Sequence, residues 1–178
     1  ALEAGVESAR EVVVIGDGAE WIWNLAAHHY PGATQIVDYW HACQHIHEFA
    51  RTYYGENSSQ GRHWTDRHCR DLKHKGPRKL LRALSCMRPQ TLEQAAASRL
   101  VRGYFEHHAQ RRAYDRLRAA GLMIGSGPVE AACKVVVGQR LKRSGMRWSA
   151  DGADAILAAR AALLSKRKDL IAKAARVA

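Results

Sequence analysis

The feature that most constrains the fold is a run of four β-branched residues at 12–15, which ends at a Gly-Asp-Gly turn at 16–18. A half-exposed strand would alternate apolar and polar residues, so this continuous run predicts a strand buried on both faces. A second short strand is predicted over 34–37. Helices are predicted over 19–29, between the strands, and over 39–54, after them. This alternation predicts a βαβα unit with two parallel strands.

The remainder of the chain is expected to be helical. Residues 62–118 have almost no β-branched runs and are rich in Arg, Leu, Ala and Gln. We expect several helices there, broken near residues 76–77 and 88–89, with Thr91 capping a helix that runs to about Gly121.

A turn at 125–128 is expected to open another helix, which ends near Ser144 and Gly145. Ser149 is expected to cap a last helix that runs to about Asp169. The fold class is therefore α/β, in three parts. These are a βαβα part over 1–55, an all-helical part over 56–120, and C-terminal helices over 121–178.

The charges are unevenly distributed. The 178 residues carry 28 Lys and Arg against 17 Asp and Glu, a net charge of +11, yet residues 1–50 contain seven acids and one basic residue. Such a basic remainder favours polyanionic partners, with nucleic acid ahead of a membrane surface. No long apolar run or signal-peptide pattern is present, and the four cysteines are unclustered. We expect a cytoplasmic protein that does not bind membranes.

Two carboxylates directly follow the predicted strands, Asp17 after the first and Asp38 after the second. The carboxyl ends of neighbouring parallel strands lie about 4.8 Å apart, at the edge where open α/β sheets bind ligands. Carboxylates so placed repel each other or share a cation. The alternative, that Asp17 forms an ordinary turn and Asp38 an ordinary helix cap, stays open.

A third carboxylate, Glu130, leads a cationic helix. It lies at the third helical position after Gly127 and Pro128, where the helix dipole favours a carboxylate. Residues 131–150 contain no acid. Their basic side chains and one indole are candidates for contacting DNA: Lys134, Arg140, Lys142, Arg143, Arg147 and Trp148.

Oxygen ligands of this kind suit Mg²⁺ or Mn²⁺. Two such ions can clamp the attacking and leaving oxygens of an in-line displacement, which would give phosphodiester cleavage and strand transfer. We expect Asp17 and Glu130 to be metal ligands. His41 and His45 share a helix face and could suggest zinc, but no four-ligand set closes around them, so we expect His41 to hydrogen-bond within the site or to orient substrate.

Three stretches carry a resemblance to a known family: residues 12–23, residues 31–42, and residues 125–130 continuing into 140–149. They resemble bacterial insertion-sequence transposases of the DDE class, in the groups related to the Mutator superfamily. The resemblance implies an RNase H-like core with a helical insertion before the last catalytic Glu. It also implies a magnesium-dependent enzyme that binds double-stranded element ends as a homo-oligomer and moves DNA.

By this resemblance, Glu130 matches the last acid of the triad, Asp17 the second acid, and Asp38 with His41 a [Cys/Asp]-x-x-His motif. The first acid is then unaccounted for in residues 1–11. A rival alignment makes Asp17, Asp38 and Glu130 a complete triad. We favour the first alignment because such a sheet needs about five strands and only two are predicted.

Under that alignment, the chain would be a truncated element or a fragment that binds DNA with impaired catalysis. A second hypothesis is a non-catalytic DNA-binding or regulatory remnant of a transposase. A third, an α/β hydrolase that uses Asp17 and His41, lacks any nucleophile motif such as GxSxG.

Overall fold

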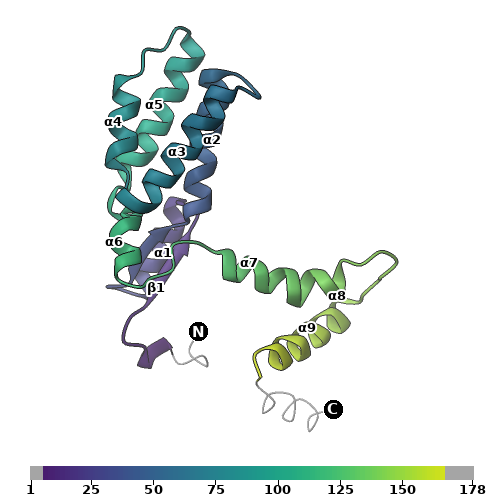
Figure 1. Ribbon diagram of the computed structural model, residues 1–178. Coiled ribbons are helices and arrows are strands. Elements are labelled where there is room, and N and C mark those ends of the chain that lie inside the picture. The colour runs from purple at the N-terminus through teal and green to yellow at the C-terminus, as the bar shows by residue number, and fades with distance from the viewer. Residues whose placement is uncertain (1–5, 167–178) are drawn as a thin grey trace. The chain divides into compact units, whose positions relative to one another are not determined.

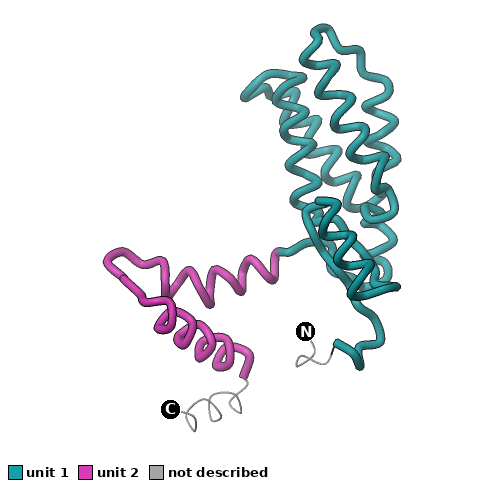
Figure 2. The backbone as a smooth tube through the Cα atoms, turned by 180° about the vertical axis from the view of Figure 1, so that it is seen from behind, with its two compact units in different colours: residues 1–126 teal, residues 127–178 magenta. Residues whose placement is uncertain are grey.

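The computed structural model describes residues 6–166 of the chain (Figure 1). The chain divides into two compact units, residues 1–126 and 127–178 (Figure 2). The described residues are mostly helical and contain two strands. None of the helices within 6–166 combines the length and apolar character needed to cross a membrane.

The first unit contains the expected parallel strands. After a short 3-10 helix, η2 (Val6–Ser8), come β1 (Val13–Gly16) and β2 (Thr34–Val37), joined by α1 (Glu20–His29). Val13 lies opposite Thr34, and the pairing is parallel. The βαβ prediction is therefore confirmed, with the first strand displaced by one residue.

Burial of these elements differs from expectation. Strand β1 is half-buried along its length, not buried on both faces, because the described residues supply it with a neighbouring strand on one side only. In β2, Ile36 and Val37 are fully buried. Helix α1 buries Trp23 and Ala26, whereas Trp21 remains 63% exposed.

Four helices run alongside one another beyond the strands (Figure 1): α2 (Tyr39–Tyr54), α3 (Ser59–Lys75), α4 (Arg78–Cys86) and α5 (Leu92–His107). The predicted breaks near 76–77 and 88–89 are confirmed. Thr91 caps α5 as expected, because its side chain accepts a hydrogen bond from the N–H of Gln94.

Strands and helices share one hydrophobic core. Its buried members come from β2, from α2 to α5 and from the segment after α5; they include Ile36, Ile46, Phe49, Leu72, Leu80, Phe105 and Tyr114. The helices expected as a separate part over 56–120 therefore pack in the same unit as the strands.

The helix expected from Thr91 to about Gly121 is wrong in its second half. Helix α5 ends at His107, and a 3-10 turn, η3 (Gln110–Arg112), and a short helix, α6 (Tyr114–Ala119), follow. The break lets the chain turn back toward β2. The hydroxyl of buried Tyr114 donates to the backbone oxygen of Val37 at 2.9 Å.

The second unit begins with α7 (Gly127–Cys133) and continues through a π-helical segment, η4 (Lys134–Gly138), into α8 (Gln139–Leu141). The wider turns of a π-helix alter the pairing of backbone groups. Two carbonyl oxygens of η4, those of Val135 and Val136, accept hydrogen bonds from the Arg160 guanidinium at 2.8 and 3.0 Å.

The last described helix is α9 (Ala150–Leu164). Ser149 caps it, as predicted, by accepting a hydrogen bond from the N–H of Gly152. The predicted end near Asp169 lies outside the described residues.

Candidate active site at the carboxyl edge of the strands

Asp17 directly follows β1 and is exposed to solvent. Its Oδ1 accepts a hydrogen bond from the N–H of Ala19 at 2.9 Å, which closes the turn between β1 and α1. Among the described residues, its Oδ2 has no hydrogen-bond partner. Gly18 has φ +106°, a conformation that a residue with a Cβ rarely adopts. The local sequence thus builds a sharp turn that presents one carboxylate oxygen to solvent.

Asp38 occupies the equivalent position after β2 but has very different surroundings. It is 6% exposed, and its Oδ1 accepts hydrogen bonds from the N–H groups of Trp40 at 2.7 Å and His41 at 3.2 Å. Its Oδ2 accepts from the N–H of Ser126 at 2.5 Å. Asp38 is therefore the N-cap of α2 and also holds a distant segment.

These surroundings change the acidity of Asp38. Burial alone would raise the pKa of this carboxyl group, but hydrogen bonds from Ser126, His41 and Trp40 outweigh burial and leave the pKa below its ordinary value. Asp38 is thus held as a carboxylate by its backbone partners.

The segment before α7 is anchored on the start of α2. Besides the bond to Ser126, the N–H of Tyr39 donates to the carbonyl of Ile124 at 2.8 Å. A Cβ on Gly125 would lie 3.3 Å from the Trp40 ring and 3.7 Å from Asp38 Oδ2, so this segment packs closely against both side chains.

Arg112 was missed by sequence reasoning. It is 0% exposed, and its Nη1 donates to the Tyr104 carbonyl at 2.6 Å, while its guanidinium lies 3.6 Å from the centroid of the Tyr104 ring. The Nε and Nη2 of Arg112 and the hydroxyl of Tyr104 are buried without hydrogen-bond partners. A Cβ on Gly18 would lie 3.6 Å from Arg112 Nη2. A buried cation therefore lies directly behind the Asp17 turn.

Nothing in the local sequence distinguishes Arg112 from Arg111. The guanidinium of Arg111 reaches Gln35 Oε1 at 2.8 Å and lies 4.8 Å from the Trp23 ring, and it is only half-buried. The break after α5 decides which of the two cations enters the core.

His41 lies at the start of α2 and its Nδ1 is 3.1 Å from Gln44 Oε1. Its ring packs edge-on against His45, at 5.0 Å between centroids, and His45 stacks on Tyr104 at 3.9 Å. Burial, followed by the charge of His41, lowers the pKa of His45. His41, His45 and Tyr104 thus form a continuous series of ring contacts that leads to Arg112.

Glu130 and the candidate DNA-binding residues belong to the second unit. All of these side chains are exposed. The Arg140 guanidinium lies 5.5 Å from the centroid of the Trp148 ring, so one face of this indole already has a cationic partner.

Within 6–166, no group of three or more His, Cys, Asp or Glu side chains is arranged to hold a metal ion. The described residues thus give the zinc alternative no ligand set. The oxygen donors Asp17 and Glu130 remain of the type that Mg²⁺ uses, since this ion needs only one or two carboxylates beside water and substrate phosphates.

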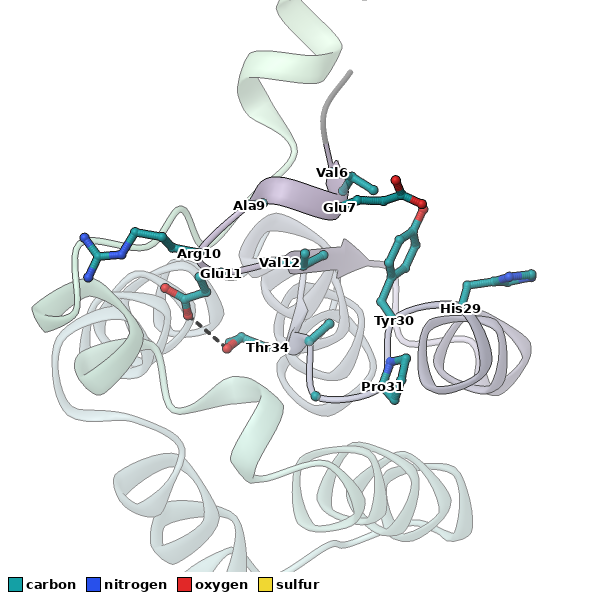
Figure 3. A pocket seen from close by; sticks show the side chains of 12 residues that line it. Val6, Glu7, Ala9, Arg10, Glu11, Val12, His29, Tyr30, Pro31 and Thr34 are labelled. Carbon is teal, nitrogen blue, oxygen red and sulfur yellow. Dashed lines mark hydrogen bonds between the residues drawn. The ribbon is translucent and has the colours of Figure 1, made fainter. Parts of the chain in front are cut away.

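A hollow of about 740 Å³ lies at the opposite edge of the strands. Residues from the segments 6–12 and 29–34 line it (Figure 3). Thr34 Oγ1 donates to Glu11 Oε1 across it at 3.1 Å. Asp17 and Asp38 are not among its lining residues.

No family model, curated protein or solved structure matches this chain. The assignment of function therefore depends on the residues themselves.

Proposed function

We propose that this chain is part of a DDE-class DNA transposase with an RNase H-like core, which cleaves phosphodiester bonds and transfers DNA strands. Asp17 and Glu130 are its metal ligands. The observation that carries the proposal is the contrast between Asp17 and Asp38. At equivalent ends of parallel strands, Asp17 leaves one carboxylate oxygen open to solvent, whereas Asp38 is buried and bonded.

This contrast favours the alignment in which Asp38 is not a member of the triad. A carboxylate has about four acceptor sites. Three backbone N–H groups already bind that of Asp38. Asp38 and His41 then act as positioning residues: Asp38 holds the start of α2 and the segment that precedes α7, and the N–H of His41 is one of the donors to Asp38.

A bound divalent cation would supply Lewis-acid stabilisation of the attacking and leaving oxygens. The other contributions to the proposed reaction come from residues of this chain. Asp17 presents a carboxylate on a turn fixed by Gly18, and Arg112 supplies a fixed positive charge behind that turn. The exposed cations of the second unit neutralise DNA phosphates, which gives affinity without base specificity.

Nicking of a supercoiled plasmid in Mg²⁺ or Mn²⁺ tests this proposal, with DNA binding measured in parallel in EDTA. We expect the wild-type chain to bind and to nick, and Glu130→Gln to bind equally but to lose nicking. Glu56→Gln is the matched control, because Glu56 is an exposed turn residue remote in sequence from all three motifs.

Binding by the wild-type chain without any metal-dependent nicking would instead support the non-catalytic DNA-binding remnant. Nicking that survives Glu130→Gln would exclude Glu130 as a catalytic residue.

A further inference from the structure

A second feature of the first unit has the chemistry of a ligand site. Helices α2 and α3 enclose a cleft of about 560 Å³. One face of α2 and one face of α3 line it over about two helical turns: Tyr39, Trp40, Cys43, Gln44, His47, Asp66, Cys69, Arg70, Lys73 and His74.

The cleft has an excess of positive charge. Arg70 and Lys73 line it together with a single acid, Asp66. Among the described residues, neither cation forms an ion pair with a carboxylate. The Lys73 ammonium lies 5.7 Å from the centroid of the Tyr39 ring.

Another cation borders the cleft from a different helix. Arg118 of α6 donates from Nη1 to His74 Nδ1 at 3.1 Å, so His74 is held as an acceptor with its neighbour's guanidinium beside it. Cations from two helices therefore converge at one place, which favours an anionic ligand.

Trp40 supplies an aromatic surface to the same cleft. Its indole is 59% exposed, so a large apolar surface stays in contact with water. The side chain is nevertheless held, because it packs edge-on against Tyr39 at 5.1 Å and against the backbone of Gly125. A fixed and exposed indole is a preformed stacking surface.

We propose that the α2–α3 cleft binds an unpaired nucleotide of a DNA strand, with its base stacked on Trp40 and its phosphates on Arg70 and Lys73. Cationic grooves that carry a stacking aromatic residue are the usual means of binding single strands. A cleft of this volume admits small ligands, whereas a duplex is too wide to enter it.

The position of Trp40, two residues after Asp38, starts the cleft at the carboxyl edge. The inference therefore rests on the proposed function in its choice of ligand: it assigns the cleft an unpaired strand close to the scissile phosphate. The residues proposed to bind the unpaired strand lie on α2 and α3, whereas those proposed to bind duplex DNA lie in the second unit.

Fluorescence anisotropy of a short labelled single strand, with the full chain in EDTA, tests the cleft independently of catalysis. We expect Trp40→Ala to weaken single-strand binding by roughly tenfold. The double variant Arg70→Glu/Lys73→Glu should weaken it at least as much. Binding of a duplex of the same sequence should change by less than about twofold in both.

Two controls match these changes. Trp21→Ala removes another exposed indole, and Arg78→Glu/Arg82→Glu reverses two exposed charges on α4 that do not line the cleft. Both controls should leave single-strand binding within about twofold, and far-ultraviolet circular dichroism should verify folding of every variant.

Unchanged single-strand binding in the cleft variants, or an equal loss in the controls, would overturn the proposal. Competition by a mononucleotide or by an acidic peptide as effective as the strand itself would reassign the cleft to that ligand and overturn the strand assignment. If the wild-type chain does not nick DNA, these binding results still stand, because they are measured in EDTA. The two proposals can therefore fail separately.

Discussion

The carboxylate of Asp38 accepts a hydrogen bond from the backbone N–H of Ser126 at 2.5 Å, although 88 residues separate the two in sequence. This bond joins the start of α2 to the segment that leads into α7. It makes Asp38 a structural carboxylate, while Asp17, at the matching position after β1, accepts a hydrogen bond from the N–H of Ala19 within its own turn.

Asp38→Asn should destabilise the first unit, whereas Asp17→Asn should not. The Asn amide can still cap α2 through its oxygen, but its NH₂ group cannot accept the hydrogen bond from Ser126. We expect a loss of about 1–3 kcal/mol in the free energy of unfolding. Asp17→Asn, at an exposed position, should change it by less than about 0.5 kcal/mol. Urea denaturation measures both, and equal losses would contradict the different roles of the two residues.

Gly18→Ala and Gly103→Ala should have opposite effects on stability. Gly18 has φ +106°, a conformation that strains any residue with a Cβ, so alanine should cost about 1–2 kcal/mol, although its Cβ would make only ordinary van der Waals contacts with Arg112 and Tyr104. Gly103 lies within α5 and a Cβ there would meet nothing within 4 Å, so alanine should stabilise by about 0.5–1 kcal/mol. Thermal unfolding checks the signs. Stabilisation by Gly18→Ala would show that the turn differs from the one described.

His108 should make stability fall in mild acid. Burial, followed by the charge of Arg111, lowers its pKa to about 4, and the Arg111 guanidinium bonds to its Nδ1. The folded state therefore binds the proton less well than the unfolded chain. The stabilisation is present above about pH 6.5, the ordinary pKa of histidine, and is lost as the pH falls toward 4.

His108→Gln should accordingly flatten the pH dependence of the unfolding free energy in this range. Exposed His63, replaced in the same way, is the control. A wild-type profile that His108→Gln leaves unaltered would exclude the proposed contribution.

Duplex DNA binding should depend on Lys142 and Arg143. Each lost phosphate contact lowers the slope of log binding constant against log salt concentration by about 0.9. Lys142→Ala/Arg143→Ala should therefore reduce the slope by about 2, and Arg78→Ala/Arg82→Ala should leave it unchanged. An identical slope in all three proteins would remove Lys142 and Arg143 from the DNA-binding surface.

The elements predicted correctly depend on local sequence. The β-branched run before Asp17, the side-chain caps Thr91 and Ser149, and the break at Gly76-Pro77 act over a few residues, so their effect is readable in one stretch of chain. The predicted strand at 12–15 differs from β1 by one residue at each end.

The features that could not be predicted depend on contacts distant in sequence. The end of α5 at His107 follows from the packing of Arg112 and Tyr114 against the turn after β1 and the end of β2. The different roles of Asp17 and Asp38 depend on Ser126. Both carboxylates follow a short strand, and no local pattern shows which one a distant backbone amide will bind.

The most direct test of the central claim is the rate of Mn²⁺-dependent plasmid nicking by Asp17→Asn and by Asp38→Asn, at a temperature where circular dichroism shows both to be folded. A metal ligand contributes several kcal/mol, so Asp17→Asn should lose on the order of a hundredfold or more. Asp38→Asn, which alters a positioning residue, should lose less than about tenfold. Nicking by Asp17→Asn at the wild-type rate would contradict the account.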